Sequence, residues 1–70
     1  MKEPNRLLVA THNGRTFRIE PDFPEVGCYL LVFEGKTCVA DHLQDTTEMC
    51  LRFAERHFGV PRDAWVDETG

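Results

Sequence analysis

The sequence predicts an α+β domain in which a four-stranded antiparallel β-meander carries one C-terminal helix on one face, as a two-layer sandwich. Three observations lead to this prediction. Two short turn signals, Asn13-Gly14 and Gly35-Lys36, each lie between runs of strand-forming residues. A single amphipathic stretch follows the second pair of runs and ends at a glycine. A chain of 70 residues is the length of one small domain, so residues 1–70 are expected to form a single unit.

The first predicted hairpin joins strands over about residues 6–12 and 15–20. Its Asn-Gly pair supplies the positive φ angles that a two-residue type I′ turn requires. Such a turn places Leu8 opposite Ile19, and the alternate positions of both strands are apolar on that face. We expect this face of the hairpin to enter the core.

The second predicted hairpin joins strands over about residues 28–34 and 37–43. Its first strand, "CYLLVFE", is apolar at successive positions, so it presents apolar side chains on both faces of the sheet. We expect the helix to cover the bulkier of the two faces. That face would carry Leu8, Phe17, Ile19, Tyr29, Leu31 and Phe33.

The helix is predicted over about residues 46–58, where polar and apolar residues separate at a helical period. Asp45 is a suitable N-cap, and Glu48 follows three residues later in the pattern of a capping box. Gly59 is typical of the residue that ends a helix, because glycine adopts the left-handed conformation without a steric penalty.

The last predicted element is a short turn over about residues 61–66. It starts at Pro61, which cannot continue a helix. We expect this turn to return Trp65 toward the apolar side of the helix, near Phe58.

The sheet face that the helix leaves uncovered is also expected to be apolar. It would carry six aliphatic side chains, which we predict as the partner-binding residues: Leu7, Val9, Leu30, Val32, Val39 and Leu43. A patch on the order of 400 Å² is in the range of the largest apolar patch on a typical monomer, and such patches mark interaction sites. The sequence therefore favours a small non-enzymatic protein-interaction module. It would form a weak homodimer or bind a protein partner through this face or a sheet edge.

Composition argues against several other classes of function. The formal net charge of −4 is unfavourable for a nucleic-acid surface, which requires clustered basic side chains. No apolar run approaches the roughly 18 residues of a membrane span, so no membrane partner is expected. The three cysteines form an odd set without C-x-x-C spacing, which predicts reduced thiols and a cytoplasmic location. No cofactor is expected, because the glycines account for turns, a helix end and the terminus rather than a phosphate loop.

An alternative hypothesis is a small metal- or ligand-binding protein. His12, His57 and Cys38 are predicted to lie toward the same end of the sheet, and histidine and cysteine are common zinc ligands. Their separation along the chain matches no local metal-binding motif. Asp41 and His42 are neighbours, but they point to opposite faces of a strand, so no catalytic residue is predicted and an enzyme is not expected.

Two families resemble parts of the chain. The segment "YLLVFEGKTCVADHLQDTTEMCLRFAERHFGVPRDAW" resembles small uncharacterised bacterial proteins that end in a helix, an F-G-V-P step and a tryptophan. That resemblance covers about half of the chain and implies no particular activity. A shorter one joins "PDFPEVGC" and "QDTTEMCLRFAE" to the antitoxins of HicB-type toxin–antitoxin pairs. It implies an antitoxin-like or immunity-like protein that neutralises a small toxin by binding it, and no functional residue is carried over.

Overall fold

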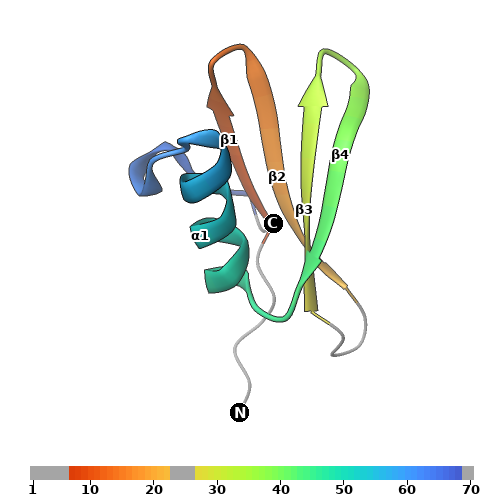
Figure 1. The fold of residues 1–70 in the computed structure, drawn as a ribbon, viewed down its shortest axis with the longest axis vertical. Helices are drawn as coiled ribbons and strands as arrows, with labels where there is room; N and C mark the ends of the chain where they lie inside the picture. Colours follow the sequence, from red (N-terminus) through yellow and green to blue (C-terminus); the bar gives the residue numbers. More distant parts are fainter. Residues whose placement is uncertain (1–6, 23–26, 69–70) are drawn as a thin grey trace.

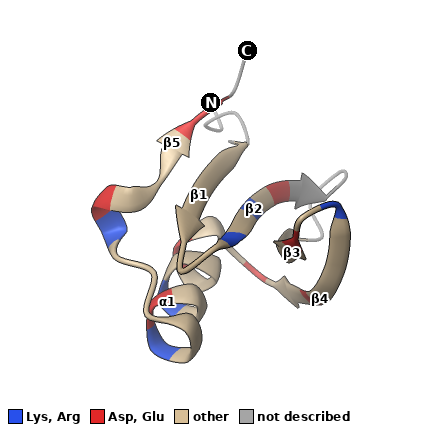
Figure 2. Cartoon of the chain, turned by 90° about the horizontal axis from the view of Figure 1, so that it is seen from above, with Lys and Arg blue, Asp and Glu red and all other residues tan. Residues whose placement is uncertain are grey.

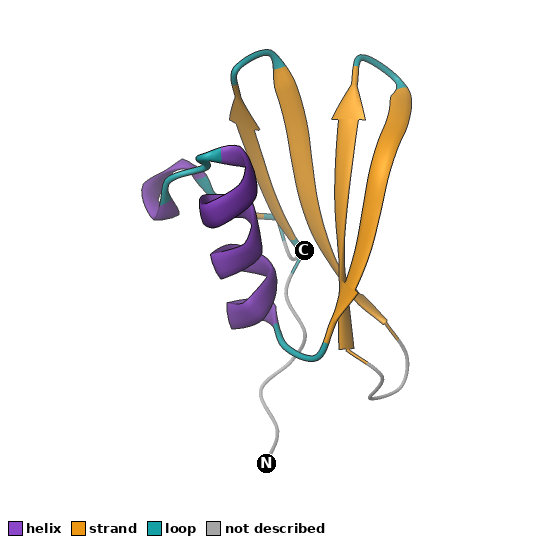
Figure 3. Cartoon of the chain, in the orientation of Figure 1, coloured by secondary structure: helices purple, strands orange, loops and turns teal. Residues whose placement is uncertain are grey.

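The described residues of the chain fold into an antiparallel sheet with one long helix on one face, so the predicted α+β architecture is confirmed (Figure 1). The computed structural model describes residues 7–22 and 27–68. The elements in chain order are β1 (Leu8–His12), β2 (Arg15–Asp22), β3 (Gly27–Glu34), β4 (Thr37–Gln44), α1 (Thr47–Phe58), a 3₁₀ turn η1 (Arg62–Ala64) and β5 (Val66–Asp67). The strands lie in the order β4-β3-β2-β1-β5, so the four predicted strands form the expected meander and a fifth extends it. The 3₁₀ turn η1 lies beside α1 (Figure 3).

The first hairpin has the register that its turn predicts. Asn13 and Gly14 take φ angles of 52° and 77°, the left-handed values that a type I′ turn needs at both positions. The strands pair Leu8 with Ile19 as predicted, and both side chains are buried. The turn therefore fixes which side chains of this hairpin share a face, and the apolar face is the one that is buried.

The core lies between α1 and the facing side of the sheet. Its buried hydrophobic residues are Leu8, Ala10, Phe17, Ile19, Cys28, Leu30, Val32, Cys50, Ala54 and Val60. Within the described part of the chain no polar or charged residue is buried. Burial of each large aliphatic or aromatic side chain contributes about 1.5–3 kcal/mol, so this set is the main source of stability in so small a domain.

α1 begins one residue later than predicted. Its N-cap is Thr46 rather than Asp45, because Thr46 Oγ1 accepts a hydrogen bond from the Met49 amide at 3.1 Å. The carboxylate of Glu48 instead accepts two hydrogen bonds from the Arg62 guanidinium, at 2.7 and 3.2 Å. This bidentate pair joins η1 to the start of α1, and the hydrogen bonds from Arg62 lower the pKa of Glu48 below its usual value.

The end of α1 and the segment after it complete the core. Gly59 ends the helix as predicted, with a φ angle of 73°, and its amide donates to two carbonyl groups in the last turn. Val60 is fully buried. Trp65 packs edge-on against Phe17, with ring centroids 6.5 Å apart, and Phe17 also contacts Phe58 at 5.3 Å. Trp65 thus returns to the core as predicted, and its ring contact is with Phe17 of β2.

The sequence does not predict β5. Val66 pairs with Val9 of β1, and the Glu68 amide donates a hydrogen bond of 2.7 Å to the Leu7 carbonyl. A strand of two residues has no periodic pattern of its own, and it forms because β1 offers an open edge. The turn predicted over residues 61–66 therefore corresponds to η1 together with the first residue of β5.

β3 presents to the core the face opposite to the predicted one. β2 and β3 pair Ile19 with Leu30, so the alternate residues from Leu30 onward share the core face. Leu30 and Val32 are 0% and 1% exposed, whereas Tyr29 is 36% exposed. The prediction that the helix covers Tyr29, Leu31 and Phe33 of this strand is therefore wrong. Both faces of β3 are apolar, so alternation cannot select one, and the pairing with β2 makes the selection.

A β-bulge in β4 changes the predicted pairing of the second hairpin. The turn at Gly35-Lys36 has two residues, as predicted. In a regular two-residue hairpin Val32 would pair with Val39. Here Val32 pairs with Ala40, so Val39 is the additional, unpaired residue of the bulge. The bulge moves every later side chain of β4 to the face opposite to the one a regular hairpin would give it.

Candidate functional site

The sheet face opposite α1, which we call the outer face, is the candidate functional site. Strand pairing assigns its principal apolar side chains as Val9, Tyr29, Leu31, Phe33, Leu43 and Val66. The charged side chains on the same face are Arg18, Glu20 and Asp41. The apolar side chains therefore span both sides of the central strand β2.

The outer face leaves hydrophobic side chains in contact with water. Leu43 and Val66 are 49% and 59% exposed, and Tyr29 is also exposed. Leu31 and Phe33 are half-buried by their neighbours on the sheet. In residues 7–22 and 27–68 the helical elements are α1 and η1, and neither lies over this face (Figure 3).

The structure places only part of the predicted partner-binding set on the outer face. The members found there are Val9 and Leu43, whereas Leu7 precedes β1 and strand pairing does not assign it to a face. Val39 is exposed at the bulge, as the extra residue of β4. Leu30 and Val32 are wrong, because both are core residues under α1. The sequence analysis missed Tyr29, Leu31, Phe33 and Val66 on this face. No local signal could have found them, since β3 is apolar on both sides and β5 has no pattern.

One ion pair lies at the centre of the outer face. Arg18 Nε is 2.9 Å from Glu20 Oε2, and the two residues are two positions apart on β2. Arg18 Nε is shielded from water and has no hydrogen-bond partner among the described residues, so the contact with Glu20 is ionic. β2 is the middle strand of the five, and Figure 2 marks its basic and acidic positions.

The predicted metal ligands are not brought together. His57 stacks on Phe53, with ring centroids 4.1 Å apart, and His42 packs on the same ring at 4.4 Å. Cys38 is exposed on the bulged strand β4. Among the residues that the structure describes, no group of three or more His, Cys, Asp or Glu side chains is placed to hold a metal ion. His12, His57 and Cys38 therefore do not form the site that the alternative hypothesis requires.

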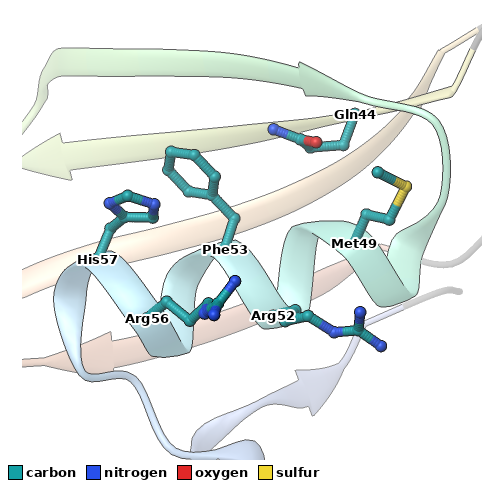
Figure 4. Close-up of a pocket in the computed structure, with 6 residues that line it drawn as sticks. All are labelled: Gln44, Met49, Arg52, Phe53, Arg56 and His57. Carbon is teal, nitrogen blue, oxygen red and sulfur yellow. The ribbon is translucent and has the colours of Figure 1, made fainter.

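A shallow groove of about 240 Å³ lies between α1 and β4 (Figure 4). Its lining residues are Gln44, Met49, Arg52, Phe53, Arg56 and His57. Figure 4 shows Phe53, His57 and Met49 on the side of α1 that faces the strands, and Arg52 and Arg56 further round the helix. The lining has no nucleophile beside a base, which is the arrangement that nucleophilic catalysis needs.

Cys38 is expected to react with thiol reagents much faster than Cys28 and Cys50. Cys38 is exposed, whereas the other two are buried. Burial, and to a smaller extent the neighbouring Cys28, raises the pKa of the Cys50 thiol to about 12, so its reactive thiolate is rare near neutral pH. Timed alkylation with iodoacetamide, followed by mass spectrometry, should label one site in the folded protein and the other two only after urea is added.

A Cys38→Ser variant is the control for this measurement. This variant should show no fast alkylation, and the slow alkylation of Cys28 and Cys50 should be unchanged. Fast labelling of Cys28 or Cys50 in the folded protein would contradict their burial between α1 and β3.

The described residues thus form a small α+β domain in which α1 and η1 lie on one side of the sheet and the outer face lies on the other. Comparison of the chain with protein-family models, with curated proteins and with solved structures found no significant match. No helix in the described part of the chain has the length and apolar character needed to cross a membrane.

Proposed function

We propose that the protein is a non-enzymatic, cytoplasmic protein-interaction module that binds another protein through its outer face. The observation that carries the proposal is the exposure of Tyr29, Leu43 and Val66 on one side of a sheet whose other side is covered by α1. Burial of apolar surface contributes about 25 cal/mol per Å², so a partner that covers this face gains free energy from contact. The proposal of a reducing compartment rests on the sequence, in which the three cysteines form an odd set without C-x-x-C spacing.

The outer face supports this proposal better than the edges of the sheet do. β4 is one edge strand, and the bulge at Val39 together with the charge of Asp41 hinders pairing with a further strand. β5 is the other edge strand, and its two residues are a short template. The partner is therefore expected to contact side chains of the outer face rather than the backbone of an edge.

The structure does not favour the alternative of a metal-binding protein, because no described cluster of ligands supports it. An antitoxin-like or immunity-like role is a special case of the proposed function, in which the bound protein is a small toxin. That role stays a prediction.

Photo-crosslinking in cells tests the proposed function. A benzophenone side chain at Leu43 should form adducts with another protein chain, whereas the same side chain at Met49 should form few or none. The two positions are matched, because their side chains are 49% and 41% exposed, but Met49 lies on α1 rather than on the outer face. Equal yields at the two positions, or adducts at Met49 alone, would contradict the proposal.

A further inference from the structure

The centre of the outer face is complementary in charge to itself, and a third charge on this face, Asp41, lies on the edge strand β4. Arg18 and Glu20 place opposite charges at neighbouring positions of β2, the middle strand of the sheet. Arg18 Nε has no hydrogen-bond partner in the described part of the chain, although it is shielded from water. A guanidinium group has five N–H donors, so Arg18 can bind a second carboxylate as well as Glu20.

We propose that the partner of the outer face is a second copy of this chain, related by a two-fold axis that lies midway between the two sheets, perpendicular to β2, and passes over the point between Arg18 and Glu20. This inference rests on the proposed function and names its partner. In a two-fold contact, residue i of one copy faces residue j of the other, and j also faces i. This axis brings Arg18 opposite Glu20 of the partner subunit, and Glu20 opposite Arg18 of the partner subunit.

The same axis brings apolar side chains together. On β3, Leu31 lies beside Arg18 and Tyr29 lies beside Glu20. The two-fold axis that exchanges the positions of Arg18 and Glu20 therefore also exchanges those of Leu31 and Tyr29. Leu31 therefore faces Tyr29 of the partner subunit. Each copy covers the apolar face of the other, in the face-to-face sheet packing that leaves about 10 Å between sheets.

The size of the face limits the affinity. A sheet of five strands, with neighbouring strands about 4.8 Å apart and a rise of about 3.3 Å per residue, offers on the order of 400 Å² per copy. The area that the two copies would bury together is below the roughly 1,200 Å² at which stable complexes begin. Shielded ion pairs set the register of an interface more than its affinity. We therefore expect a dimer with a Kd of about 100 µM to 1 mM.

Charge reversal tests this arrangement. Arg18→Glu places like charges opposite each other in a homodimer, and Glu20→Arg does the same with the other sign. Each single variant should self-associate at least ~10-fold more weakly than the wild-type chain. An equimolar mixture of the two should form a heterodimer, because each reversed charge meets its opposite in the other variant. The double variant R18E/E20R should dimerise like the wild-type chain. Sedimentation equilibrium up to about 1 mM measures all four cases.

The matched control is Arg52→Glu, a reversal of the same size on α1, which should leave self-association unchanged. Circular dichroism shows whether each variant is folded. Where a reversal prevents folding, Arg18→Gln and Glu20→Gln replace the reversals. Each should weaken the dimer several-fold.

A wild-type chain that stays monomeric at about 1 mM would overturn the second copy as the partner. A dimer that tolerates both reversals would overturn the axis between Arg18 and Glu20. If photo-crosslinking at Leu43 still captures other proteins, the failure concerns this inference alone. If position 43 forms no adduct of any mass, the proposed function fails with it.

Discussion

Leu30→Ala is expected to lower the free energy of unfolding by about 3 kcal/mol. Leu30 is fully buried between β2 and β4, where it pairs with Ile19 and His42. Truncation removes apolar contacts and leaves a cavity that the neighbouring strands fill only in part. A domain of this size has a folding stability of roughly 4–10 kcal/mol, so the loss is a large share of the total. Urea denaturation followed by circular dichroism measures it.

The matched control is Leu31→Ala, the same substitution one position along β3. Leu31 is half-buried on the outer face, so we expect a loss of about 1 kcal/mol in unfolding free energy. The same variant should weaken self-association, because Leu31 lies in the proposed contact. If Leu31→Ala were the more destabilising of the two, β3 would present the opposite face to the core.

Gly27→Ala is expected to destabilise the protein by about 3 kcal/mol or more. Gly27 begins β3 with a φ angle of 139°, a conformation that side-chain-bearing residues rarely adopt. An added Cβ would also overlap the backbone carbonyl oxygen of Gln44, at the end of the neighbouring strand β4. Backbone atoms cannot rotate away as a flexible side chain can, so the two strands must separate. Thermal and urea unfolding both measure the effect.

Gly14→Ala is the control that separates the two causes. Gly14 also has a positive φ angle, of 77°, but an added Cβ there has no atom within 4 Å among the neighbours that the structure describes. We expect the free energy of unfolding of this variant to fall by about 1 kcal/mol, which is the cost of holding alanine at a positive φ angle without any steric overlap. Equal losses at the two glycines would show that the start of β3 does not approach Gln44 closely.

Elements with a local cause could be predicted from the sequence. Asn13-Gly14 sets the register of the first hairpin, because a type I′ turn aligns the two strands that it joins. Gly59 ends α1 for a similarly local reason. The N-cap was predicted one residue early, since Asp45 and Thr46 are both good caps and only the backbone geometry distinguishes them.

The candidate site was predicted less completely than the fold. Val9 and Leu43 were correctly placed on the outer face, whereas Leu30 and Val32 proved to be core residues. The error has a physical origin, because a strand that is apolar on both sides satisfies two registers equally well.

The sequence by itself determined two hairpins, one amphipathic helix and a sheet with more apolar side chains than that helix can cover. Only the tertiary structure decided which of those side chains remain outside. That decision depends on the pairing of β2 with β3, on the bulge at Val39 and on the approach of Gly27 to Gln44. All three depend on how neighbouring strands pair in the sheet, which local residue preferences do not encode.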